Sequence, residues 1–399
     1  MTIQSPLDKL AVENFREYLR IPSVQPDVNY DASVAFLQKL AKDIGLQCVV
    51  HEQFPKKPFV VISCIGEDPS LQSILLNNHM DVVPAFEAQW THKPFAADID
   101  ENGNIYARGA QDMKCLSIEY LEAIRRLKLS EVKLRRTIHV SFAPDEEIGG
   151  AKGMMKFAKS KEFASLNVGF AIDECFPNEG DLFAVATGEK AQWHFRIHVP
   201  GSTGHSSQMF ENTAPEKLYV ILDRFYSYRR KEMHRLKKGN VKISDVVSIN
   251  VTQIEGGVPS SVLPSKIIVC FDCRFPLHQN MDEWEKTMNS WCKEAGDDVW
   301  IEYLQKNPLV PATKLDASNK YWNEFQKAAN KLNLKLQVQT LEGGTDIRHV
   351  RALGIPAIGF SAVFNTPNRE HKDDEYLNVD VFLKGIAIYC GLIEAVANA

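Results

Sequence analysis

The sequence predicts an α/β domain with a mostly parallel sheet, interrupted by a smaller ferredoxin-like α+β domain. Three observations support this fold class. Up to residue 187, short unbroken apolar runs alternate with helical patterns, as expected when a parallel sheet is covered on both faces. The same alternation returns from residue 309 to the end. Between these parts, residues 188–308 follow a different and self-contained order of elements.

The first domain therefore comprises residues 1–187 and 309–399. Ser5 and Pro6 predict the start of an amphipathic helix. Strands are expected at residues 59–65, 73–78, 137–143 and 168–173, with a helical stretch at 150–160 before the last of them. Towards the C-terminus we expect a helix at 319–332, a strand at 335–340, a helix at 345–354, a strand at 356–362 and a closing helix at 378–399.

The inserted region is expected to contain four strands and two helices. The strands are expected at residues 193–199, 244–254, 265–275 and 298–305, and the helices at 212–236 and 281–295. In chain order these segments give β-α-β-β-α-β, which is the order of the ferredoxin-like or split βαβ unit.

Composition excludes several classes of function. The chain has 399 residues, of which 46 are basic and 51 acidic, for a net charge of −5. The densest basic stretch, 228–238, alternates with apolar residues as a helix does, so nucleic acid is not an expected partner. No apolar run approaches the ~20 residues that cross a bilayer, and the N-terminal helix does not resemble a signal peptide. Eight cysteines lie mostly within apolar segments and are expected to be reduced core residues of a cytoplasmic protein.

Acidic and imidazole side chains follow successive strands of the first domain. His79 and Asp81 lie on one face where a strand ends, because side chains two apart in extended backbone point the same way. The other members of the series are Asp112; Asp145, Glu146 and Glu147; Asp173 and Glu174; and His371. Each has an ordinary explanation when taken alone: Asp112, for example, could cap the following helix. Together, at the carboxyl ends of one sheet, they predict a shared metal site.

The ligand types favour zinc or a similar divalent cation. Two imidazoles and several carboxylates, without clustered thiolates, suit an open catalytic site better than a closed structural one. A carboxylate can also bridge two cations ~3.5–4 Å apart. Glu146 and Glu147 are consecutive, so their side chains diverge, and one can bind a cation while the other takes a proton from water. Asp81 is placed to orient the imidazole of His79.

Six motifs extend this pattern over the chain. They are HMDVVP at 79–84, ARGAQDMK at 107–114, APDEEIGG at 143–150, GHSS at 204–207, EGGTDIRHVRALGIPAIGFS at 342–361 and HKDDEYL at 371–377. In this order and spacing they resemble the co-catalytic di-zinc amidohydrolases, the family that includes carboxypeptidase G and the succinyl-diaminopimelate desuccinylases. The resemblance implies a zinc-peptidase-like catalytic domain formed by 1–187 and 309–399. It also implies a lid and dimerisation domain at 188–308, and hence a homodimer.

The resemblance implies a role for each site residue, with two Zn²⁺ ions per subunit. The expected ligands are His79, Asp112 as the bridge, Glu147, Glu174 and His371. Asp173 leaves a one-residue ambiguity beside Glu174. Glu146 would be the general base and acid. The family also leads us to expect a cis peptide bond after Asp112.

The inserted domain supplies the second part of the implied mechanism. His205 resembles the histidine that family members offer across the dimer to the oxyanion of the tetrahedral intermediate. Arg274 and Arg348 are candidates for binding a substrate carboxylate. Further substrate contacts are expected at Asn250, Gly343 and Gly344, where the two glycines would let the backbone approach the ligand closely.

The implied reaction is zinc-dependent hydrolysis of an N-acyl-L-amino acid to a carboxylate and a free L-amino acid. Two alternatives stay open at the level of sequence. A dipeptidase or carboxypeptidase on the same scaffold would present the same carbonyl group to the metal site. A non-catalytic zinc-bound dimer acting as a binding protein is the other alternative, although such a protein would not need a carboxylate base beside its metal.

Overall fold

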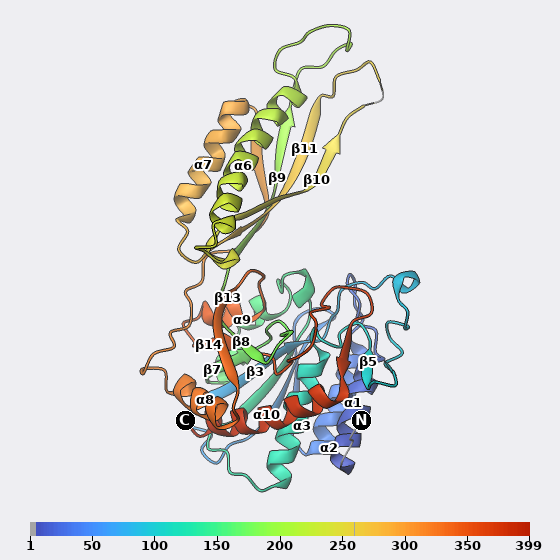
Figure 1. Cartoon of the computed structure of the whole chain (residues 1–399), viewed down its shortest axis with the longest axis vertical. Helices are drawn as coiled ribbons and strands as arrows, with labels where there is room; N and C mark the ends of the chain where they lie inside the picture. The colour runs from blue at the N-terminus through green and yellow to red at the C-terminus, as the bar shows by residue number, and fades with distance from the viewer. Residues whose placement is uncertain (1–4, 259) are drawn as a thin grey trace. The chain divides into compact units, whose positions relative to one another are not determined.

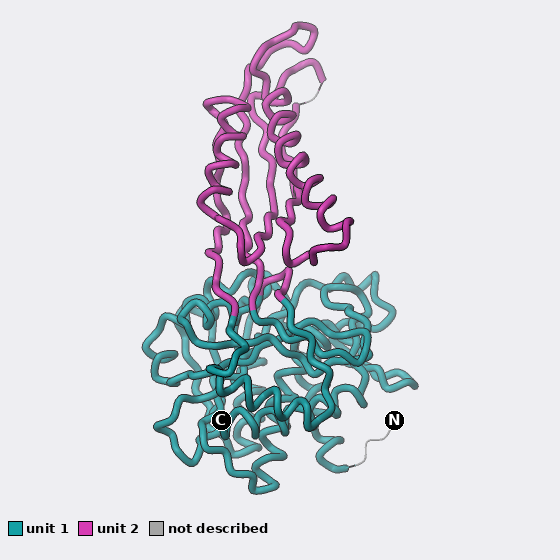
Figure 2. Tube along the Cα trace, turned by 60° about the vertical axis from the view of Figure 1, so that its left-hand side comes forward, with its two compact units in different colours: residues 1–187, 313–339, 345–399 teal, residues 188–312, 340–344 magenta. Residues whose placement is uncertain are grey.

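The chain folds into two units, which the computed structural model describes over residues 5–258 and 260–399 (Figure 1). Unit 1 contains the residues up to 187 together with 313–339 and 345–399. Unit 2 contains residues 188–312 and the short segment 340–344 (Figure 2). Each unit has a hydrophobic core of its own. Among the described residues, no helix combines the length and the hydropathy that a bilayer span requires.

Unit 1 is built on a mixed sheet of eight strands. In spatial order these are β1 (Gln47–Phe54), β2 (Lys57–Cys64), β6 (Ile138–Ala143), β3 (Ser73–His79), β7 (Val168–Asp173), β14 (Ala357–Gly359), β8 (Leu182–Glu189) and β13 (Lys335–Leu341). The central strands β6, β3, β7 and β14 are parallel to their neighbours in this group. The pairs β1–β2, β2–β6 and β14–β8 are antiparallel. The predicted fold class, an α/β domain with a mostly parallel sheet centre, is confirmed.

Helices cover both faces of this sheet. Successive side chains of a strand point to opposite faces, so an unbroken apolar strand presents apolar side chains on both faces. Val60 and Ile62 of β2 join the core beneath one layer of helices, whereas Phe59 and Val61 join the core beneath the other. The first layer consists of α1 (Pro6–Leu19), α2 (Asp31–Ile44), α3 (Lys114–Leu129), α8 (Lys320–Lys331) and α10 (Val379–Ala397). The second layer consists of α4 (Met154–Phe157), α5 (Lys161–Ser165) and α9 (Ile347–Arg351). The sheet is thus buried on both sides, as the unbroken apolar runs predict.

Local signals place most helix ends correctly. α1 begins at the predicted cap, where Ser5 and Asp8 form a reciprocal capping box. Two helices are shorter than expected: the stretch 150–160 forms only the four residues of α4, and 345–354 only the five of α9. A separate sheet is formed by three short strands in connecting segments of unit 1. In spatial order they are β15 (Tyr376–Asn378), β5 (Asn104–Tyr106) and β4 (Asp98–Ile99).

Unit 2 has the predicted β-α-β-β-α-β order. Its elements are β9 (Ala191–Pro200), α6 (Ala214–Lys237), β10 (Ser248–Gly256), β11 (Lys266–Phe275), α7 (Met281–Ala295) and β12 (Trp300–Lys306). The four strands form an antiparallel sheet in the order β10-β11-β9-β12. Both helices lie on one face of this sheet (Figure 1), over a core rich in aromatic side chains.

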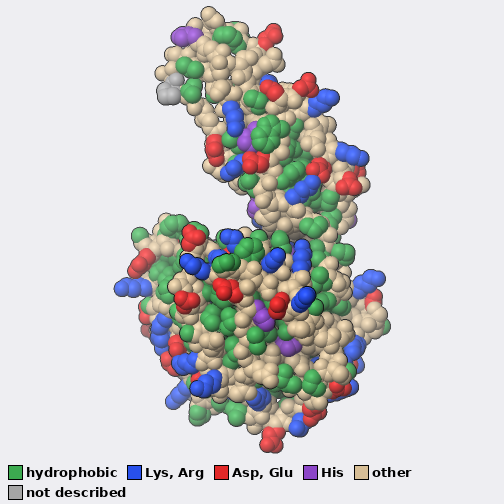
Figure 3. Space-filling view, turned by 180° about the vertical axis from the view of Figure 1, so that it is seen from behind, with side chains coloured by type: hydrophobic (Ala, Val, Ile, Leu, Met, Phe, Trp, Pro, Cys, Tyr) green, Lys and Arg blue, Asp and Glu red, His purple; other side chains and the backbone are tan. Residues whose placement is uncertain are grey.

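The visible surface carries charges of both signs. On the face that Figure 3 draws, acidic and basic side chains are interspersed over both units. This mixture agrees with the small net charge of −5.

Candidate metal centre

The parallel strands of unit 1 end at one edge of the sheet, and the predicted polar residues lie there. His79 is the last residue of β3 and pairs with Ala143, the last residue of β6. The turn that carries Glu146 and Glu147 follows β6, and Glu174 follows β7. This is the edge where open α/β sheets bind ligands.

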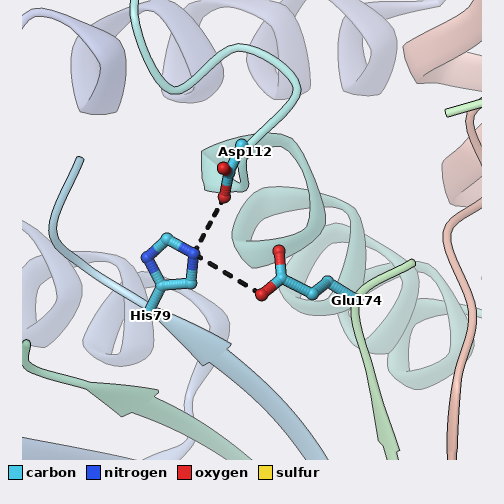
Figure 4. Close-up of side chains that lie close together, drawn as sticks. All are labelled: His79, Asp112 and Glu174. Atoms are coloured by element: carbon cyan, nitrogen blue, oxygen red, sulfur yellow. Dashed lines mark hydrogen bonds and ion pairs between the residues drawn. The ribbon is translucent and has the colours of Figure 1, made fainter. Parts of the chain in front are cut away.

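Asp112 lies between two imidazoles. Its Oδ1 is 3.0 Å from Nε2 of His79, and its Oδ2 is 3.0 Å from Nε2 of His371. The His79 imidazole also faces Glu174, whose Oε1 lies 3.7 Å from the same Nε2 (Figure 4). On the other side, Oε2 of Glu147 is 3.1 Å from Nε2 of His371.

The predicted ligands form two groups that share Asp112. One group is His79, Asp112 and Glu174, and the other is Asp112, Glu147 and His371; within each, one ligand atom per residue lies within 4.8 Å of the others. Asp173 belongs to neither group, so the geometry favours Glu174 of the adjacent pair. Side chains as far apart in the sequence as His79 and His371 are therefore brought together, as the motifs predict.

The loop that carries Asp112 is held by Glu375, a residue for which the sequence predicts no role. The Glu375 carboxylate is buried, pairs with Arg108 at 2.7 Å, and accepts backbone N–H bonds from Gly109, Gln111 and Asp112. The Asp112–Met113 peptide bond is cis, which confirms that expectation. Glu375 lies within a quoted motif, but its partners are more than 260 residues away in sequence, so no local pattern reveals them.

Asp81 contacts its neighbours differently from the expected arrangement. The backbone carbonyl of Asp81, not the carboxylate, lies 2.9 Å from Nδ1 of His79, and the carboxylate is 3.7 Å away. The carboxylate instead accepts the backbone N–H groups of Glu146 and Glu147, each at 3.1 Å. The carbonyl can fix the His79 tautomer that leaves Nε2 free for a cation. The carboxylate holds the turn at residues 145–147, which we call the acidic turn.

The electrostatics of the centre show an excess of negative charge. Burial, together with the charge of Asp112, raises the pKa of Glu147 to about 7 and that of Glu174 to about 8. Hydrogen bonds to Asp112 and Glu147 raise the pKa of His371 to about 10. Burial also raises the pKa of Glu146 well above its usual range. Carboxylates this close repel one another unless positive charge lies between them.

The residues fit divalent cations. Oε1 of Glu147 is buried and makes no hydrogen bond to the described residues, although buried carboxylate oxygens normally have a partner. Both imidazoles direct Nε2, a metal-binding nitrogen, towards carboxylate oxygens. Imidazole and carboxylate ligands without thiolates suit zinc and similar ions. Since Asp112 belongs to both groups, the centre has ligands for two cations.

The remaining predicted residues are divided between the units. His205, Asn250, Arg274, Gly343 and Gly344 belong to unit 2, and Arg348 belongs to unit 1. His205 is exposed, and its Nδ1 lies 2.7 Å from Oγ of Ser207. Asn250 is exposed on β10.

Two arginines expected to bind substrate already have protein partners. Arg274 forms a bidentate pair with Asp272, at 2.8 and 3.0 Å, and the Gln192 amide lies between Arg274 and the backbone N–H of Gly344. Arg348 is buried, and its Nη2 donates to the carbonyl of Gly149 at 3.3 Å. Arg274 and Gly344 are thus brought together, while Arg348 contacts the end of the acidic turn.

Comparison with known proteins agrees with this geometry. A model of peptidase family M20/M25/M40 matches residues 75–395, a range that includes all five candidate ligands. Among curated proteins, the chain is 42% identical over 388 residues to aminoacylase-1 of Sus scrofa, covering 97% of this chain and 95% of the relative. It is 38% identical over 398 residues to aminoacylase-1 of Dictyostelium discoideum, covering 96% and 97%.

Solved structures share the fold at low sequence identity. An M20 family metallo-carboxypeptidase from Sulfolobus solfataricus superposes with a TM-score of 0.78 at 18% identity, over 97% of this chain and 99% of that one. YXEP of Bacillus subtilis, described as a dinuclear metal binding peptidase from the M20 family, gives 0.68 at 14% identity, over 97% and 98%. At these identities the likeness concerns the fold alone.

Proposed function

The chain belongs to peptidase family M20/M25/M40, and on that premise we propose that it hydrolyses N-acyl-L-amino acids to a carboxylate and a free L-amino acid. The substrate class rests on full-length relatives named aminoacylase-1 that are 38% and 42% identical to the chain. The reaction type rests on the acidic centre of unit 1. Both point to a hydrolase that acts on amide bonds.

The ligands for the cofactor are the five residues that the sequence predicts. His79, Asp112 and Glu174 would hold one Zn²⁺, and Asp112, Glu147 and His371 the other. When bound, such cations supply Lewis acidity that polarises a carbonyl group and lowers the pKa of water to about 7. The observation that carries this proposal is Asp112, whose two oxygens each lie 3.0 Å from a different imidazole.

Glu146 is the proposed general base and acid. It follows the same strand as Glu147 but belongs to neither ligand group, so its carboxylate stays available for proton transfer. It would accept a proton from the attacking water and return that proton to the leaving nitrogen. Asp81 would keep Glu146 in place through the hydrogen bond to its backbone N–H.

Unit 2, together with Arg348 of unit 1, would supply the groups that recognise substrate. His205 would donate to the oxyanion of the tetrahedral intermediate. Arg274 and Arg348 are the proposed partners of the substrate carboxylate, because a guanidinium can bind a carboxylate with two hydrogen bonds. Arg274 already binds Asp272 in this way through Nε and Nη2, so substrate would share it with Asp272 or displace Asp272. Asn250, Gly343 and Gly344 are proposed as further contacts.

The proposed partner in solution is a second copy of the chain. β10 is an edge strand of the unit 2 sheet. A hollow beside it is lined by Tyr219, Leu222, Tyr226, Val251 and Ile254, together with the charged Asp223 and Arg230. Exposed edge strands and apolar surfaces are typical sites of association. A solution mass twice the 45.0 kDa of one chain would support the homodimer. A cytoplasmic location is proposed from the eight cysteines, all of which are free.

A substrate panel tests the proposed function directly. Zinc-loaded protein should hydrolyse N-acetyl-L-methionine at least ~10-fold more efficiently, by kcat/KM, than a dipeptide with the same C-terminal residue, because an aminoacylase pocket need not accommodate a free substrate amine. Preference for the dipeptide would assign the chain to the dipeptidases of the same fold. If the protein bound two cations but hydrolysed neither substrate, it would be a binding protein and not an enzyme of this class.

A further inference from the structure

Three consecutive backbone N–H groups at the metal centre are bound by side chains from elsewhere in the chain. The N–H of Asp145 donates to the hydroxyl of Tyr30 at 2.9 Å. The next two, of Glu146 and Glu147, donate to the two oxygens of Asp81, each at 3.1 Å. Such a run of side-chain bonds fixes the backbone of the acidic turn independently of the sheet.

Tyr30 binds Asp145 twice. Besides accepting the backbone N–H, its hydroxyl donates to Oδ1 of Asp145 at 2.8 Å. A hydroxyl can donate and accept at once, so this arrangement ties the side chain of Asp145 to its own backbone. Asp145 has a left-handed φ of 60°, which is uncommon for a residue other than glycine. The conformation therefore depends on contacts that hold it.

Gln25 links the two carboxylates that support the turn. Its buried Nε2 donates to Oδ2 of Asp81 at 2.8 Å and to Oδ1 of Asp145 at 3.0 Å. The amide nitrogen must face these carboxylates, since they only accept hydrogen bonds. Lys57, at the start of β2, adds an ion pair to Oδ1 of Asp145 at 2.8 Å. All of these groups lie within unit 1.

We infer that Gln25 and Tyr30 are positioning residues for catalysis: through Asp81 and Asp145 they set the backbone of the turn that presents Glu146 and Glu147. Neither Gln25 nor Tyr30 belongs to the two ligand groups. Their effect reaches the reaction only through the turn. The kinetic part of this inference rests on the proposed function, whereas the part that concerns the turn does not.

The test compares Tyr30→Phe with Tyr321→Phe. Tyr321 is a matched control because it is also buried in unit 1, and its hydroxyl donates to a side chain, Gln72, at 3.3 Å. Gln72 precedes β3, at the end opposite to His79. Tyr30→Phe removes one hydroxyl and leaves the backbone N–H of Asp145 without its acceptor.

The first readout is amide hydrogen exchange of the turn at residues 145–147. Exchange there should become at least ~10-fold faster in Tyr30→Phe, because a lost hydrogen bond makes local opening easier, and should be unchanged in Tyr321→Phe. Unchanged exchange in Tyr30→Phe would overturn the inference whether or not the protein is an amidohydrolase. No turnover by the unaltered protein would instead count against the proposed function.

The second readout separates kcat from KM and follows cation affinity. Tyr30→Phe should lower kcat ~10–100-fold with KM within about 2-fold, since groups that support ligands typically change activity or metal affinity by that factor. In Zn²⁺ titrations of metal-free protein, one of the two cations should bind more weakly, because only one group contains Glu147. An equal loss of affinity for both cations, or a change in KM alone, would contradict a positioning role.

A second pair of variants keeps the inference testable if Tyr30→Phe does not fold. Asp145→Asn keeps an acceptor oxygen and tolerates a left-handed φ, whereas Asp145→Ala has neither property. We expect the Asn variant to retain kcat within ~5-fold and the Ala variant to lose at least ~10-fold. Equal loss in both variants would mean that the charge of Asp145, and not the geometry of the turn, matters.

Discussion

The side chains at the centre make different contacts, and these contacts distinguish their proposed roles. Asp112 faces both imidazoles, Glu147 faces that of His371, and Glu146 belongs to neither ligand group. We propose that these consecutive residues of one turn differ in function, because only Glu147 belongs to a candidate ligand group. The division between Glu146 and Glu147 follows from the backbone of the turn, which Asp81 holds at both N–H groups.

Glu146→Gln tests this division. The amide has nearly the same shape but cannot accept a proton from water, so kcat should fall by at least ~10². Zinc content should stay at the level of the unaltered protein, since Glu146 is outside both ligand groups. Turnover and metal analysis on the same sample measure both effects. Glu162→Gln, which removes an exposed carboxylate on α5, is the control and should change neither; comparable turnover by Glu146→Gln would contradict its role.

Glu119 on α3 predicts a pH dependence of stability. It is fully buried, both carboxylate oxygens lack hydrogen-bond partners among the described residues, and burial raises its pKa well above the usual range. The folded protein therefore keeps a proton on Glu119 that the unfolded chain releases above its pKa of about 4.3. Stability is lost as pH rises above that value, by about 1.4 kcal/mol per pH unit until the folded pKa is reached.

Glu119→Gln removes this titration and should raise the free energy of unfolding by about 1–3 kcal/mol at pH 7. The gain should shrink towards zero near pH 4, where the carboxyl is protonated in both states. Denaturant unfolding at the two pH values measures it. Glu122→Gln on the same helix is the contrast, because Glu122 pairs with Arg125 at 2.9 Å, and its loss should destabilise. A Glu119→Gln variant less stable at both pH values would refute the reasoning.

At the scale of elements, unbroken apolar runs were the strongest signal. The four central parallel strands were all anticipated because they are rich in apolar residues, and burial on both faces leaves no exposed position in β6, β3 and β7. β1 was missed, since it is an edge strand with no fully buried residue, and its sequence has no such run. The helical stretch 150–160 was overestimated: α4 begins only after a turn in which the N–H of Gly153 donates to the carbonyl of Gly150, and it ends at Phe157.

Gly153 also predicts a coupling between α4 and the acidic turn. A Cβ at this position would overlap the carbonyl oxygen of Pro144, a backbone atom that cannot move aside without shifting the turn. Gly153→Ala should therefore lower stability by about 1–3 kcal/mol and reduce kcat. Gly180→Ala is the control, because a Cβ there has no neighbour within 4 Å. Thermal unfolding and turnover of both variants check the prediction; a Gly153→Ala protein equal to the control in both would contradict it.

For the molecule as a whole, the sequence predicted which residues come together at the centre better than it predicted the contacts that these residues make. The motifs named candidate ligands as distant as His79 and His371. His79 ends a parallel strand and Glu174 follows one, at the same edge of the sheet, whereas Asp112 and His371 come from connecting segments. The support from Gln25 and Tyr30 was missed because these residues lie 115–120 positions from Asp145. Hydrogen bonds between such distant polar residues leave no periodic or local pattern in a sequence. The hydrogen bonds that the Asp81 carboxylate accepts from the acidic turn were missed for the same reason.

The central claim is that unit 1 gathers distant residues into a centre for two cations. Anomalous diffraction at the zinc edge, from crystals grown with Zn²⁺, tests it most directly. We expect two peaks, one among His79, Asp112 and Glu174 and the other among Asp112, Glu147 and His371. A single peak, or zinc bound only away from Asp112, would contradict it.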